Sequence, residues 1–122
     1  MCYNLGKLTI RPSDVTVDKE KVITFKCSTS MKTPVNWLYT KFNETAISKI
    51  IYESGFLTEE FKGKVNVSNI TVNVPGNETW HGFDLTIFNP QCAEDGTYTC
   101  IDDAGRGPDT AAANLFLGMY KF

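Results

Sequence analysis

The chain has 122 residues, of which 42% are hydrophobic, so it is long enough for one packed core and too apolar for a disordered tail. Its 12 basic and 14 acidic side chains give a formal net charge of −2, which excludes the basic surface that nucleic-acid binding requires. No apolar run approaches the roughly 20 residues of a membrane span. We therefore expect residues 1–122 to form one domain without a membrane segment of its own.

Strand patterns dominate the chain, because short β-branched and aromatic runs recur between turn residues and no helical period is sustained. In the third run, apolar and polar residues alternate and place Cys27 on an inward face. The run at 64–74 changes parity midway, and a bulge near Ser68 and Asn69 would reconcile its two halves. The expected strands lie at residues 7–10, 14–17, 21–28, 35–41, 47–52, 64–74, 83–89, 97–102 and 113–120. This series predicts an all-β sandwich of two antiparallel sheets.

The cysteines and the glycosylation acceptors indicate the compartment. Four cysteines without Cys-x-x-Cys spacing favour disulfides over a zinc or redox motif. Four Asn-x-Ser/Thr sequons accompany them, which favours a secreted or cell-surface setting. We expect an extracellular glycoprotein and a fragment of the N-terminal ectodomain of a larger protein. The sequons begin at Asn43, Asn66, Asn69 and Asn77.

One constellation is specific to a family. Cys27 is followed ten residues later by Trp37, and the motif Tyr98-x-Cys100 lies far downstream within "LTIFNPQCAEDGTYTC". This pattern resembles the immunoglobulin superfamily over nearly the whole chain. The resemblance implies a bridge between Cys27 and Cys100 that joins the two sheets, with Trp37 packed on the sulfurs. It also implies that the Tyr98 hydroxyl ties the preceding corner to its own backbone.

Further features of the resemblance refine the type. The long interval between the two cysteines leaves room for extra edge strands, which is typical of the variable-type (V-set) sandwich. The segment from Phe61 to Val65 resembles the start of strand D, where a basic residue pairs with an acid at the corner before strand F. We therefore expect Lys64 to pair with Glu94, with Asp95 as the second choice. The Phe-Gly-x-Gly start of an antibody strand G is absent, which argues against a rearranging receptor domain.

Catalysis has little support. The only histidine is His81, beside Trp80, and no nucleophile–base pair or metal-ligand pattern surrounds it. We interpret His81 as an ordinary loop residue and the constellation of Cys27, Trp37, Tyr98 and Cys100 as scaffold. The prediction is a non-enzymatic protein that needs no cofactor or metal.

Alternation also predicts an exposed apolar face. If Trp37 and Tyr98 point inward, the residues that alternate with the inward ones on the same two strands face outward. These strands belong to the GFCC′ sheet, whose outer face V-set members commonly use for pairing. The predicted partner-binding residues are Leu38, Thr40, Phe42, Thr99 and Ile101. The alternative is that these are ordinary surface hydrophobes covered by neighbouring side chains.

The resemblance implies a recognition or adhesion domain at the cell surface that binds a protein. The Asp-Gly-Thr-Tyr-Thr-Cys ending and the sequon load resemble those of invertebrate members, including hydroid allorecognition receptors that bind homophilically between cells. The partner would be either a second copy on an opposing cell or a different receptor. A second hypothesis is a soluble innate-immune domain that grips a foreign ligand through its CDR-like loop at 102–110. A third is a spacer domain with no partner.

Two cysteines stand outside the family pattern. An even number of cysteines predicts a bridge between Cys2 and Cys92 within the domain. A simple strand ladder, however, places Cys2 and Cys92 at opposite ends of the sandwich. Either the N-terminal segment departs from the family path, or these thiols pair outside the domain.

Overall fold

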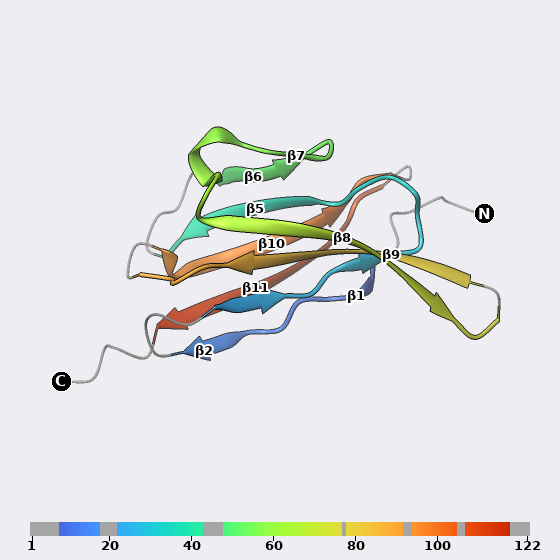
Figure 1. Cartoon of the computed structure of the whole chain (residues 1–122), viewed down its shortest axis with the longest axis horizontal. Coiled ribbons are helices and arrows are strands. Elements are labelled where there is room, and N and C mark those ends of the chain that lie inside the picture. The colour runs from blue at the N-terminus through green and yellow to red at the C-terminus, as the bar shows by residue number, and fades with distance from the viewer. Residues whose placement is uncertain are drawn as a thin grey trace.

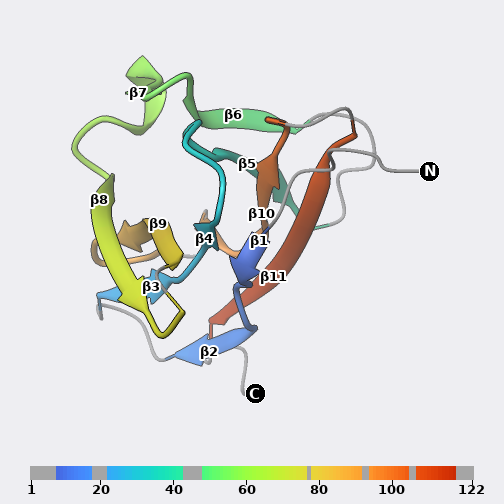
Figure 2. The ribbon, with the colours of Figure 1, turned by 90° about the vertical axis from the view of Figure 1, so that its right-hand side faces the viewer.

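The computed structural model describes residues 8–17, 22–42, 48–76, 78–91, 94–104 and 107–117. Their strands form two sheets that pack face to face, as the two views in Figure 1 and Figure 2 show. Within these ranges the one helical element is the short 3-10 turn η1 (Glu59–Phe61). None of the described helical structure is long and apolar enough to cross a bilayer.

The smaller sheet has five strands, and all its pairs are antiparallel. Its long strand β9 lies at the centre, with β3 and β4 on one side and β8 on the other, while β1 pairs with β4. The predicted strand at 21–28 is therefore two strands, β3 and β4, that pair with different parts of β9. The members are β1 (Leu8–Ile10), β3 (Ile23–Phe25), β4 (Ser28–Thr29), β8 (Val65–Val74) and β9 (Glu78–Ile87).

The larger sheet has six strands in the order β2-β11-β10-β5-β6-β7. Its pairs are antiparallel except at one edge, where β2 and β11 run parallel. The chain changes sheets between β1 and β2 at the buried Pro12, which has no N–H to continue a ladder. The members are β2 (Val15–Val17), β5 (Asn36–Lys41), β6 (Lys49–Glu53), β7 (Phe56–Leu57), β10 (Gly96–Asp102) and β11 (Asp109–Leu117).

The core lies between the sheets and is built by the inward residues of alternating strands. From the smaller sheet come Phe25, Leu85 and Ile87, each at most 1% exposed. The larger sheet contributes Trp37 of β5 and the buried inward residues of β10 and β11. The prediction of an all-β sandwich with a central core is confirmed.

The β8–β9 hairpin extends past the sandwich as a two-stranded ribbon (Figure 1). Its register is continuous from Val65 opposite Ile87 to Val74 opposite Glu78, so the predicted bulge is wrong. Inward residues such as Val65 pack in the core. The apolar residues after Ser68 lie instead on the outer face of the ribbon. The parity change in the sequence therefore marks the place where the hairpin leaves the core.

The edge of the larger sheet contains two features that the strand pattern did not reveal. A bulge places one extra residue on β6, so Ile51 and Tyr52 are both buried although they are consecutive. Ser54 and Gly55 then turn with φ of 53° and 89°, which is the left-handed conformation of a tight two-residue hairpin. This turn adds β7, which the sequence reading did not include.

Candidate functional site

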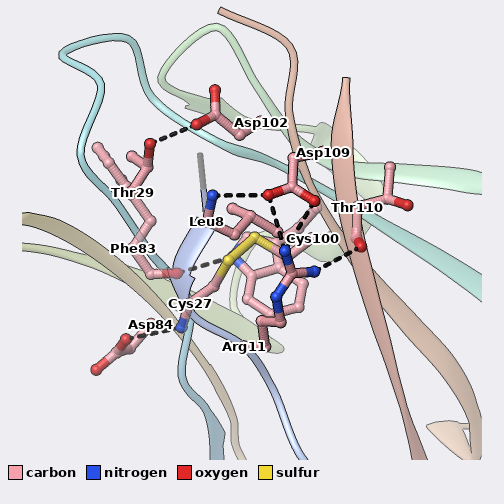
Figure 3. The surroundings of a disulfide bond; sticks show 11 residues. Leu8, Arg11, Cys27, Thr29, Phe83, Asp84, Cys100, Asp102, Asp109 and Thr110 are labelled. Atoms are coloured by element: carbon pink, nitrogen blue, oxygen red, sulfur yellow. Dashed lines mark hydrogen bonds and ion pairs between the residues drawn. A yellow bond between two sulfur atoms is a disulfide. The ribbon is translucent and has the colours of Figure 1, made fainter. Parts of the chain in front are cut away.

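The two cysteines of the family constellation meet between the sheets, and Figure 3 shows their surroundings. Cys27 and Cys100 form a disulfide, with their Cα atoms 6.6 Å apart, and both residues are fully buried. Trp37 lies directly opposite Cys100 on the neighbouring strand, and its indole Nε1 donates a 2.8 Å hydrogen bond to the Phe83 carbonyl. The bridge and this hydrogen bond each connect one sheet to the other, so these residues are scaffold.

Tyr98 and Tyr39 organise the corner between β9 and β10. The Tyr98 hydroxyl donates to the Glu94 carbonyl over 2.5 Å, and the Tyr39 hydroxyl donates to the Asp95 carbonyl over 2.6 Å. Burial raises the pKa of Tyr98 far above its usual value, and the nearby Tyr39 and acidic charges raise it further. Tyr98 therefore stays protonated and remains a hydrogen-bond donor.

The predicted ion pair between Lys64 and Glu94 is wrong, since it is absent among the ion pairs of the described residues. The Glu94 carboxylate instead accepts a 2.8 Å hydrogen bond from the Gln91 N–H, which turns it back toward its own corner. The second choice, Asp95, lies 4.0 Å from Lys41 of β5. The corner is thus held to β5 and to itself.

Asp102 ties together the loops at the opposite end of the sandwich. It is fully buried, and its carboxylate accepts from the Thr29 hydroxyl of β4 and, over 3.1 Å, from the Ala104 N–H in the loop after β10. The Thr29 hydroxyl in turn accepts a 2.9 Å bond from the Met31 N–H. The two loops therefore share one buried carboxylate as an anchor.

Asp109 makes a further connection between the sheets (Figure 3). Its carboxylate accepts from the Leu8 N–H at 3.0 Å and from the Arg11 guanidinium at 2.8 and 2.9 Å. Burial alone would raise the pKa of Asp109, but the bond from Leu8 and the bonds and charge of Arg11 outweigh it and lower the pKa below 3.8. Asp109 thus holds β1 of one sheet to β11 of the other.

The predicted partner-binding residues share the outer face of the larger sheet. Thr99 lies opposite Leu38, and Thr97 lies opposite Thr40, so these side chains point to the same side of the sheet. Phe42 lies just past β5 and stacks on Phe116, with ring centroids 5.5 Å apart. All five predicted residues are half-buried, so their neighbours cover part of each side chain. The remaining member, Ile101, lies opposite Asn36.

The more exposed apolar residues of this face escaped the sequence reading. Ile50 lies opposite Leu38 and is 40% exposed, Phe116 is 41% exposed, and Phe56 after the β6–β7 turn is 77% exposed. The β6 bulge hid Ile50, whereas the Ser-Gly turn signal could have revealed Phe56. We name the outward side chains of β5, β6, β7, β10 and β11 the GFCC′ face. With Phe42, which follows β5, this face includes Ile50, Leu38, Thr99, Ala112, Thr40, Thr97, Asn114, Phe116, Phe56 and Ile101.

The sequons fall on the other sheet where the structure describes them. Asn66 and Asn69 both lie on β8 and are exposed. Asn43, Asn77 and the predicted Cys2–Cys92 bridge lie outside the described residues. The described sequons therefore leave the GFCC′ face uncovered, and the extra bridge stays a prediction.

Together, the two sheets, the inter-sheet disulfide and the tyrosine at the corner define an immunoglobulin-like domain. Solved structures agree with this class. The structure of titin domain M7 has a TM-score of 0.62 at 19% identity and covers 96% of this chain and 97% of that one. A chimeric titin Z1Z2 functionalised with an exogenous decorin peptide has a TM-score of 0.61 at 21% identity, with the same coverage. No protein-family model and no curated protein matches the sequence.

This likeness shows the fold alone. An immunoglobulin-like fold is consistent with a protein-binding module, and the buried disulfide fits an extracellular domain.

Proposed function

We propose that this chain is a variable-type recognition domain that binds a protein through its GFCC′ face at the cell surface. The observation that carries the proposal is that three exposed large apolar side chains, Ile50, Phe56 and Phe116, lie on the outer face of one sheet among half-buried neighbours. The edge strands β6 and β7 support the variable type, because variable domains add two such strands beside the strand that carries the tryptophan.

The chemistry of the GFCC′ face fits a protein partner better than a charged ligand. One row across four strands consists of Ile50, Leu38, Thr99 and Ala112, and it contains no charge. In the next row, Thr40 bonds Ser48 at 2.7 Å and Thr97 bonds Asn114 at 2.7 Å, so several polar groups satisfy each other within the sheet. Burying these rows leaves few polar groups unpaired, and depletion of charge is typical of interface cores.

A second copy of the chain is the proposed partner, as in homophilic recognition between cells. A face without charge in its central rows meets no like-charge repulsion when it packs against itself. Self-complementary packing of one surface produces a two-fold symmetric pair, the commonest form of homo-oligomer. An allorecognition role is the most specific form of this proposal.

The test compares Ile50→Asp with Val22→Asp, which places the same charge at a 60% exposed position on the other sheet. Analytical ultracentrifugation of the glycosylated chain over a concentration series reports self-association. We expect association of the unmodified chain, at least a tenfold weakening by Ile50→Asp and little change with Val22→Asp, because a charge buried in an interface core lacks a partner. A monomer at every concentration would refute homophilic binding, and equal effects of both variants would refute the face.

A second candidate function rests on the loop anchor. Asp102 holds the loops after β4 and β10 in one arrangement, and pre-organised loops favour ligand binding by lowering its entropic cost. A soluble immune domain that binds through these loops predicts loss of ligand binding in Asp103→Ala, at an exposed loop position, with Ile50→Asp unaffected. Screening secreted protein against microbial glycans and proteins separates the two candidates.

A further inference from the structure

Strand β8 has an edge without a neighbouring strand. Its ten residues pair with β9 along one side, and the sheet order places no strand on the other side among the described residues. Figure 2 shows β8 along the outer margin of its sheet. Backbone N–H and C=O groups on such an edge can pair with a strand of another molecule.

The sequence of β8 contains none of the usual protection for an edge. The run Val-Asn-Val-Ser-Asn-Ile-Thr-Val-Asn-Val has no lysine, no arginine, no proline and a continuous register without a bulge. Natural edges are protected by such charges, prolines and bulges. An uncharged, β-branched strand of this length is otherwise a template for edge-to-edge association.

Two glycosylation acceptors occupy this same strand on opposite faces. Asn66 lies opposite the outward Thr86, whereas Asn69 lies opposite the inward Phe83, so the two side chains point to different sides of the sheet. Both are exposed, and within the described residues neither side-chain amide makes a hydrogen bond. The amide nitrogens are therefore accessible, and the sites bracket the open edge.

We infer that N-linked glycans on Asn66 and Asn69 shield the β8 edge and prevent it from pairing with β8 of a second copy. In the modification, each amide nitrogen loses a proton and bonds to C1 of an oligosaccharide, while the C1–O bond to the lipid-pyrophosphate donor breaks and the lipid pyrophosphate leaves. A glycan on each face obstructs a strand that approaches the edge. The carbohydrate thus replaces the charged residues that other edges use.

This inference rests on the extracellular setting of the proposed function but not on its binding face. The two can therefore fail separately. Association through the GFCC′ face responds to Ile50→Asp, whereas association through β8 responds to changes at Asn66 and Asn69. All edge measurements are made in the Ile50→Asp background, so that the two modes of self-association do not overlap.

The experiment begins with the chain secreted from glycosylating cells and with peptide mass spectrometry of its sequons. We expect both Asn66 and Asn69 to be modified. Asn66→Gln/Asn69→Gln then removes both glycans, and we expect its weight-average mass in ultracentrifugation to rise with concentration while the glycosylated chain stays monomeric. Enzymatic removal of the glycans from folded, purified chain provides the same comparison if the double variant folds poorly. Thermal unfolding monitors the fold in each case.

A rescue variant locates the association. Asn66→Lys/Asn69→Lys also lacks both glycans but restores charge to the edge, so we expect it to stay monomeric. The matched control adds Thr16→Lys/Thr33→Lys, at exposed positions on β2 and in the loop after β4, to the glutamine variant, and we expect it still to associate. Unmodified sequons, a monomeric deglycosylated chain, or equal rescue by both lysine pairs would each overturn the inference.

Discussion

The disulfide permits the sharpest quantitative prediction. Cys27 and Cys100 are 73 positions apart, and the loop-entropy estimate for a ring of this size is about 4 kcal/mol of stabilisation. We expect Cys27→Ala/Cys100→Ala to lose at least this much, because both buried positions also lose packed sulfur atoms. Since small domains have about 5–15 kcal/mol in total, the variant should fold with a melting temperature lower by on the order of 15 °C.

Urea unfolding monitored by tryptophan fluorescence measures this loss. A Trp80→Phe background leaves Trp37 as the reporter, and Trp37 is fully buried beside the strand of Cys100. The control is unsubstituted chain refolded and unfolded in the presence of a reductant, which removes the cross-link while both native cysteine side chains remain. A loss below about 1 kcal/mol would refute the reasoning, because it would mean that the cross-link barely restricts the unfolded chain.

Further predictions concern the corner, the inter-sheet ion pair and two glycines. Tyr98→Phe should cost about 1 kcal/mol in urea unfolding, because a corner carbonyl loses its donor. Asp109→Asn should lose up to about 1 kcal/mol at pH 7, and the difference should shrink as pH falls below 3.8 and through the lowered pKa of Asp109 in the folded chain. Its lowered pKa means that the Arg11 contact stabilises only the ionised form, so an unchanged difference at pH 3 would contradict this account. Gly96→Ala should cost more than about 2 kcal/mol, because the added carbon would lie 2.5 Å from a backbone oxygen. Gly55→Ala, at a strained φ but in open space, should cost less.

Alternation predicted the interior of the sandwich well. It placed Cys27 inward, and the structure buries this residue completely, as it does Trp37, whose inward position the resemblance implied. Such predictions succeed because the side-chain period of a strand is local, and a sandwich must bury one face of every strand. The resemblance to immunoglobulin domains then supplied the order in which those strands assemble.

The candidate site was predictable in its location but not in its composition. Leu38 and Thr99 lie opposite each other as expected, yet the most exposed apolar residues of the face are Ile50, Phe56 and Phe116. Exposure depends on what the neighbouring strand places beside a residue, and the β6 bulge changes those neighbours without a clear signal in the sequence.

The sequence by itself determined the class of the domain, through the period of its strands and the spacing of Cys27, Trp37 and Cys100. Only the tertiary structure decided how the strands meet at their edges. It replaced the predicted pair of Lys64 and Glu94 with contacts inside the corner, and it left β8 open beside its two sequons. The physical reason is that inward burial follows from local alternation, whereas ion pairs, bulges and free edges depend on registers between segments far apart in the chain.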